Sequence, residues 1–181
     1  MPTFREGVAQ RVTDYHEESG WLYAQIIYNW TSGDGRDLDT RTRIVFPAVT
    51  GYVGWAQGNT QSLGGRNVIA WPSGDNTSYY GPEVALAYLG YIREALPDTQ
   101  TVNVELRANW YGERLAGNTQ VVVTVYSVDG TLLNGGYPTS GTGTPKSSLS
   151  FTANVASNQP ANIIGSSVRT ITIDLTTGAI T

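Results

Sequence analysis

Acidic and amide side chains gather in two glycine-containing segments and are the strongest candidates for chemistry in this chain. Asp37 and Asp39 follow a Ser-Gly-Asp-Gly-Arg run, Asp75 and Asn76 belong to a Ser-Gly-Asp-Asn run, and Glu83 comes shortly afterwards. Hard cations such as calcium bind about six to eight oxygens from carboxylates, amides and backbone carbonyls, and such oxygens converge readily in turns. These five residues are therefore candidate ligands of a calcium ion.

The same residues have a second interpretation. Asp and Asn are common in turns because their side chains hydrogen-bond to nearby backbone groups, and this needs no metal. The segment from Asp34 to Asp39 is not an EF-hand, because it lacks both the required glycine position and a closing glutamate. Turn formation and calcium binding both stay open on the sequence alone.

Groups that could catalyse a reaction are few. Cysteine is absent, which excludes disulfides, thiolate nucleophiles and thiolate metal sites. The single histidine, His16, lies in an acidic, polar stretch without a recognisable nucleophile partner, and we interpret it as solvated. Glu83, Glu105 and Glu113 could supply glycosidase carboxylates, but Glu105 lies on the polar side of an alternating strand, where we expect it to face solvent. We therefore expect no enzymatic activity.

Aromatic side chains offer a different kind of site. The chain has 5 Trp and 11 Tyr, and exposed rings can stack on sugars while neighbouring amides bond to the hydroxyls. Trp71 and Trp110 fall within strand patterns, which favours a place in the core. Tyr79 and Tyr80 lie in a turn, so they are the candidates for a ligand-binding surface, such as one that binds a glycan.

Length and charge restrict the class of protein. A chain of 181 residues is enough for one β-domain with a core. Lys and Arg number 11 against 15 Asp and Glu, so we expect no binding to nucleic acid. The opening Met-Pro-Thr-Phe-Arg-Glu-Gly has no apolar segment, and no run approaches the roughly 20 apolar residues that cross a bilayer. We expect neither a cleavable signal peptide nor membrane insertion.

Alternating apolar and polar residues, interrupted by Gly, Pro, Asn and Asp, are typical of antiparallel sheets. The pattern predicts strands over residues 21–30, 40–46, 52–55, 67–71, 101–110, 119–128, 148–155 and 168–175. Residues 83–96 are compatible with a strand followed by one or two helical turns. Residues 58–65 predict a Gly-rich loop, and residues 135–147 a long exposed loop.

These elements predict an all-β fold. We expect an antiparallel, jelly-roll-like β-sandwich over residues 21–181 as a single domain, with at most one short helix. The polar, weakly patterned residues 1–20 are interpreted as an extended N-terminal arm. Arms of this kind often order against a neighbouring subunit, which would suit a member of a larger assembly.

Four short motifs occur in an order known from one family: Asp37-Leu38-Asp39, then the turn Gly74-Asp75-Asn76-Thr77, then Glu83-Val84-Ala85-Leu86, then Leu96-Pro97 before a Val-rich strand. Over residues 37–128 the chain resembles the calcium-binding stress-response domains of the tellurium-resistance (TerD-like) family. The resemblance implies a β-sandwich whose acidic loops hold calcium. The acidic run that follows Gly-Asp-Asn in that family is replaced here by Thr-Ser-Tyr-Tyr-Gly-Pro.

The chain is also similar in style to small β-sandwich virion proteins of tailed bacteriophages, of the decoration, fibre or baseplate type. Such proteins are often free of cysteine, rich in Gly, Thr and Asn, and equipped with an arm. The similarity implies a non-enzymatic structural subunit of a virion, made in the host cytoplasm. Such a subunit would form a homo-oligomer, contact other virion proteins and, through Tyr79 and Tyr80, bind a host-surface glycan. The alternative is a calcium-dependent carbohydrate-binding or stress-response domain.

Overall fold

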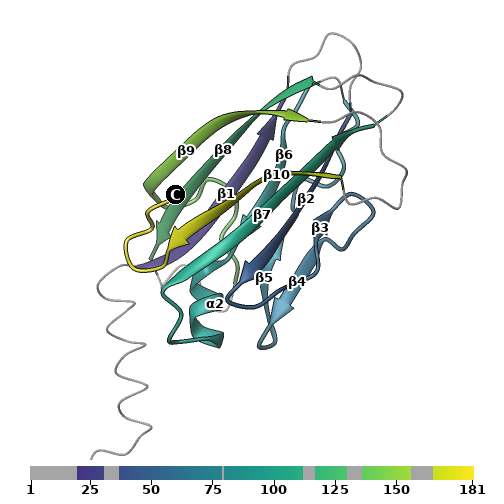
Figure 1. The fold of residues 1–181 in the computed structure, drawn as a ribbon. Helices are drawn as coiled ribbons and strands as arrows, with labels where there is room; N and C mark the ends of the chain where they lie inside the picture. Colours follow the sequence, from purple (N-terminus) through teal and green to yellow (C-terminus); the bar gives the residue numbers. More distant parts are fainter. Residues whose placement is uncertain (1–19, 31–36, 79, 112–116, 130–135, 156–164) are drawn as a thin grey trace, which may run out of the picture.

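The computed structural model describes residues 20–30, 37–78, 80–111, 117–129, 136–155 and 165–181. Two antiparallel sheets pack face to face (Figure 1), which confirms the predicted all-β sandwich. Almost all of the expected N-terminal arm lies outside the described residues, as do His16, Asp34, Tyr79 and Glu113. Within the part that is described, no helix has the length and hydropathy needed to cross a membrane.

The larger sheet has six strands in the order β4-β5-β6-β1-β8-β9. β1 lies between β6 and β8 and pairs antiparallel with both. Tyr23 and Ile26 point to opposite faces of β1, and each has 0% exposure. Both faces of β1 are therefore covered, which agrees with its apolar residues on both sides. The strands are β1 (Trp21–Asn29), β4 (Thr60–Leu63), β5 (Arg66–Ala70), β6 (Glu83–Ala87), β8 (Gly117–Val128) and β9 (Thr144–Val155).

The smaller sheet has four strands in the order β10-β7-β2-β3. They are β2 (Leu38–Phe46), β3 (Val53–Gly54), β7 (Thr101–Trp110) and β10 (Ser166–Asp174). In the antiparallel register of β2 and β7, Asp39 is opposite Asn109 and Arg43 is opposite Glu105. Because alternate residues of a strand share one face, the charged and amide side chains of these two strands, such as Asp39, Arg43, Glu105 and Asn109, form one row on the outer face of this sheet.

The core lies between the two sheets and consists of the apolar halves of the alternating strands. Val104 and Leu106 of β7 and Val123 of β8 are fully buried, as the period-2 patterns predict. Trp71 and Trp110 are also core residues, which confirms their interpretation from the sequence.

The segment with mixed spacing is a strand followed by a short helix. β6 ends at Ala87, and α2 (Leu89–Ala95) follows it and packs on β1 and β5. Gly90 in α2 lies so close to the indole of Trp21 that an added Cβ would stand 2.1 Å from its Nε1. The helix can approach β1 only because this position has no side chain.

Two expected loops differ from the structure. Residues 60–63, inside the predicted Gly-rich loop, form β4, which pairs with β5. Gly64 and Gly65 both have positive φ, 58° and 79°, and two such residues make the tight turn that joins neighbouring antiparallel strands. The glycines thus indicate a hairpin rather than an open loop. In addition, β9 begins at Thr144, within the range expected to be a loop.

Candidate metal centre

Three carboxylates meet where β2 begins and the loop between β5 and β6 passes beside it. Asp37 immediately precedes β2, Asp39 is its second residue, and Asp75 lies in the loop. One carboxylate oxygen of each residue lies within 4.8 Å of the other two. Asp39 is buried, Asp37 is half-buried and Asp75 is exposed. This acidic cluster is therefore closed on the side of the sheet and open to solvent on the side of the loop.

The Asp-Leu-Asp sequence explains why two of these carboxylates point the same way. Side chains at i and i+2 of an extended chain share a face, and Leu38 between them is fully buried in the core. The backbone carbonyl of Asp37 accepts a hydrogen bond of 2.9 Å from the backbone N–H of Tyr111, so pairing with the β7 side holds Asp37 in the extended form. Local alternation and sheet pairing together place Asp37 and Asp39.

Asn76 shapes the turn that carries Asp75. Its side-chain amide donates to the carbonyl of Pro82 at 3.1 Å, and its Oδ1 accepts from the backbone N–H of Ser78 at 3.1 Å. Its own backbone N–H donates to Glu83 Oε1 at 3.2 Å. The structure therefore engages the Asn76 side chain within its turn, as the turn interpretation of the sequence supposes.

Glu83, at the start of β6, lies behind the acidic cluster and has 0% exposure. Its carboxylate accepts hydrogen bonds from the hydroxyl of Thr40 and from the backbone of Asn76. Burial raises the pKa of Glu83 to about 8, with further increases from Asp75 and Asp39 and opposition from the two hydrogen bonds. Of the five expected ligands, the structure thus brings three together and places Asn76 and Glu83 behind them as supports.

Two oxygens of the cluster lack a hydrogen-bond partner among the described residues, namely Oδ1 of Asp37 and Oδ1 of Asp39, and both are buried. Burial raises the pKa of each carboxyl to about 6. Neighbouring carboxylates raise the pKa of Asp37 further, while Arg41 and Asn109 oppose the rise at Asp39. An unsatisfied buried acceptor costs about 1–3 kcal/mol, and more when charged. A bound hard cation would remove this cost, so the residues fit calcium.

A second polar cluster on the same sheet face corrects the expectation for Glu105. Its carboxylate is paired with Arg43 at 2.6 Å and Arg107 at 2.9 Å, and Tyr52 donates to it at 2.9 Å. Burial acts to raise the pKa of Glu105, but these hydrogen bonds outweigh it and keep the pKa below the ordinary value. Glu105 is only 9% exposed, so the expectation that it faces solvent was wrong, because its partners cover it.

Two exposed tyrosines lie near the cluster, one in the Asp75 loop and one directly after β7. Tyr80, in the Asp75 loop, is 61% exposed, and Tyr111, bonded through its backbone to Asp37, is 58% exposed. The expectation that Tyr80 is a surface residue is confirmed, and its companion Tyr79 lies outside the described residues.

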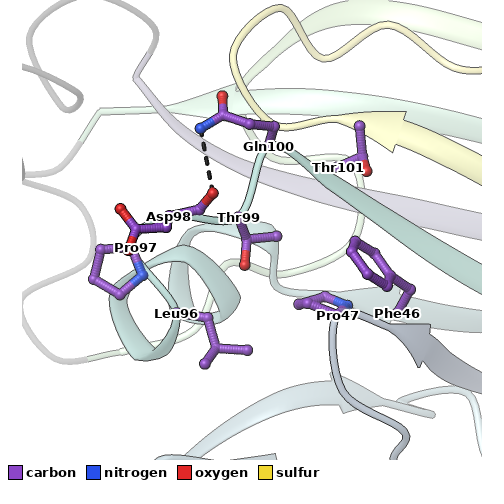
Figure 2. Close-up of a pocket in the computed structure, with 8 residues that line it drawn as sticks. All are labelled: Phe46, Pro47, Leu96, Pro97, Asp98, Thr99, Gln100 and Thr101. Atoms are coloured by element: carbon purple, nitrogen blue, oxygen red, sulfur yellow. Dashed lines mark hydrogen bonds between the residues drawn. The ribbon is translucent and has the colours of Figure 1, made fainter.

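A shallow groove of about 520 Å³ lies at the other end of β2 (Figure 2). Phe46 and Pro47 line one side of it and residues 96–101 the other. Phe46 is the last residue of β2 whereas Asp39 is the second, so the groove is remote from the acidic cluster. Its lining is largely apolar and contains one carboxyl, that of Asp98, which does not amount to a convergent polar site.

Comparisons with known proteins add no assignment to this geometry. No protein-family model matches the chain, and no curated protein or solved structure matches it either.

Proposed function

We propose that this protein is a calcium-binding β-sandwich domain. The observation that carries the proposal is Asp39, a carboxylate only 1% exposed, whose Oδ1 has no hydrogen-bond partner among the described residues and which lies within 4.8 Å of two further carboxylates. Charge repulsion and burial make this arrangement costly without a cation. The resemblance of the motif order to TerD-like domains supports the same proposal.

Asp37, Asp39 and Asp75 would hold the ion directly. Calcium supplies a positive charge that lets all three stay ionised. Asp75 belongs to the loop and Asp39 to β2, so a shared ion would fasten the loop to the smaller sheet. The exposed side at Asp75 leaves room for further oxygen ligands, which calcium needs to reach about six to eight.

The test is calorimetric titration of the chelator-treated protein with CaCl₂, with MgCl₂ as a competitor. We expect the wild-type protein to bind one calcium ion, Asp39→Asn to lose binding, and Asp98→Asn to bind as the wild type does. Asp98 is a matched control because it is an exposed aspartate in the remote groove. A wild-type protein that takes up no calcium at millimolar concentration would rule the proposal out.

A second candidate, calcium-dependent carbohydrate binding, is favoured by the exposed rings of Tyr80 and Tyr111. Sugar hydroxyls could occupy open coordination positions of calcium while a ring stacks on the sugar face. A glycan array probed with calcium and with chelator tests this. We expect binding that needs calcium, is lost in Tyr80→Ala or Tyr111→Ala, and persists in the control Phe46→Ala. Equal binding in chelator would contradict it.

Assembly into a phage-like virion stays a prediction, and one observation favours assembly in general. β9 is 12 residues long with a single charged side chain, Lys146, and within the described part of the chain it pairs only with β8. Long edge strands with few charges are templates for strand pairing. Light scattering tests this: an oligomer that Ser150→Lys dissociates supports pairing through β9, and a wild-type monomer contradicts it.

A further inference from the structure

We infer that Asn109, held in place by Arg41, is a positioning residue that presents one oxygen of Asp39 to the ion, an inference that rests on the proposed calcium site. Asn109 Nδ2 donates to Asp39 Oδ2 at 3.2 Å, and Arg41 Nη1 donates to Asn109 Oδ1 at 2.6 Å. Asp39, Asn109 and Arg41 are 1%, 2% and 1% exposed. They form a buried chain of hydrogen bonds that ends at the acidic cluster.

Arg41 determines which way the Asn109 amide points. A guanidinium has only N–H donors, whereas an Asn side chain has a carbonyl on one side and an NH₂ on the other. The carbonyl of Asn109 must therefore face Arg41, which turns the NH₂ toward Asp39. A flipped amide would place two donors against each other in a buried site, at a cost of about 1–3 kcal/mol.

In this orientation the two carboxylate oxygens of Asp39 have different roles. Oδ2 accepts from Asn109, while Oδ1 has no partner among the described residues. Asp39 can then bind an ion through Oδ1 without losing its hydrogen bond to Asn109. The buried chain of hydrogen bonds from Arg41 through Asn109 thus makes Asp39 a ligand through one oxygen and fixes the direction of that oxygen.

Arg41 itself is held from two sides. Its guanidinium carbon lies 5.2 Å from the ring centre of Trp55, and its backbone pairs with Gly54 of β3. Arg43, two residues along the same strand, instead binds the carboxylate of Glu105 directly. The two arginines share a strand and a face but differ in partner, so Arg43 supplies a matched control.

The experiment compares wild type, Asn109→Leu, the double variant R41M/N109L and the control Arg43→Met. The double variant guards against a folding defect, since removing both partners of a buried hydrogen bond can be nearly neutral. Calcium affinity is measured by calorimetry. The number of waters on bound Tb³⁺, used as a calcium probe, is measured from luminescence lifetimes in H₂O and D₂O.

We expect Asn109→Leu and R41M/N109L to weaken calcium binding by about 10- to 100-fold, the usual effect of losing a group that orients a metal ligand, and to add water to bound Tb³⁺. Arg43→Met should change neither quantity. If the variants without Asn109 kept the calcium affinity of the wild type, or bound calcium more weakly with the same number of waters on Tb³⁺, the inference would be overturned. Asp39 would then bind the ion without its hydrogen bond to Asn109. A wild-type protein that binds no calcium would instead refute the proposed function itself.

Discussion

The hydroxyl of Thr40 in β2 donates a hydrogen bond to the buried carboxylate of Glu83 in β6, and this contact joins the two sheets directly behind the acidic cluster. The same carboxylate accepts the backbone N–H of Asn76, next to Asp75. The strand that carries Asp39 and the loop that carries Asp75 therefore share one anchor. When Glu83 is ionised, it repels both Asp39 and Asp75.

The stability of the chelator-treated protein should fall as the pH rises from about 5 to about 8. Burial raises the pKa of Glu83 to about 8, whereas an unfolded glutamate titrates near about 4.3. Between these values the native state keeps a proton that the unfolded state has released, so the free energy of unfolding decreases with pH. Asp37 and Asp39, each with a pKa raised to about 6, act in the same direction.

Urea unfolding in chelator across this pH range measures the effect. Glu83→Gln, which imitates the protonated form, should show a shallower decline, with the remainder coming from Asp37 and Asp39. A variant that declines as steeply as the wild type would show that Glu83 is not the group responsible.

Asp37→Asn should stabilise the protein in chelator and weaken its response to calcium. Ionised Asp37 is disfavoured by burial first and then by repulsion from Asp39 and Asp75, and a neutral amide removes both effects. Because the carboxyl is only half-buried, solvent screening limits the gain. We expect a rise in melting temperature of up to roughly 2–4 °C, which corresponds to about 1 kcal/mol at this chain length.

Differential scanning fluorimetry measures both effects: the rise in the melting temperature of the variant in chelator and its smaller stabilisation by calcium. The wild type should gain more from calcium than the variant does. A variant that melts below the wild type in chelator would mean that the Asp37 carboxylate stabilises the metal-free fold.

Tyr28 and Thr42 should show coupled effects on stability. Their hydroxyls form a buried hydrogen bond of 2.8 Å between β1 and β2, across the core. Tyr28→Phe or Thr42→Val should each lower the free energy of unfolding by about 1–2 kcal/mol, because each leaves the other hydroxyl unsatisfied. The double variant should lose less than the sum. Chemical denaturation measures this cycle, and strict additivity would contradict the coupling.

Gly54→Ala should be far more damaging than Gly65→Ala. Gly54 has φ of 130°, and an added Cβ would lie 2.0 Å from the backbone oxygen of Thr40. Gly65 also has positive φ, 79°, but an added Cβ meets nothing within 4 Å. We expect about 1–2 kcal/mol for Gly65→Ala, from its backbone conformation alone, and more than about 4 kcal/mol for Gly54→Ala.

Thermal melts of both variants test this difference. Equal losses would indicate that β3 moves away from β2 without cost. Since Thr40 is next to Asp39, any Gly54→Ala protein that folds should also bind calcium less tightly than Gly65→Ala.

Local sequence patterns alone determined much of the secondary structure of this protein and its fold class. The period-2 alternation of β1, β7 and β8 predicted strands and an all-β sandwich, because the side chains of a strand alternate in direction whatever the strand pairs with. Asp37 and Asp39 share a face for the same reason. The buried places of Trp71 and Trp110 followed from their positions within such strands.

Only the tertiary structure decided which polar groups meet. Asn109 and Asp39 are 70 residues apart and become neighbours through the register of β2 and β7, so neither their hydrogen bond nor the role of Arg41 has a local signal. The packing of the sheets puts Glu83 behind the cluster, and the partners of Glu105 cover it. Register and packing result from burying apolar surface over the whole chain, and they place side chains that local spacing cannot.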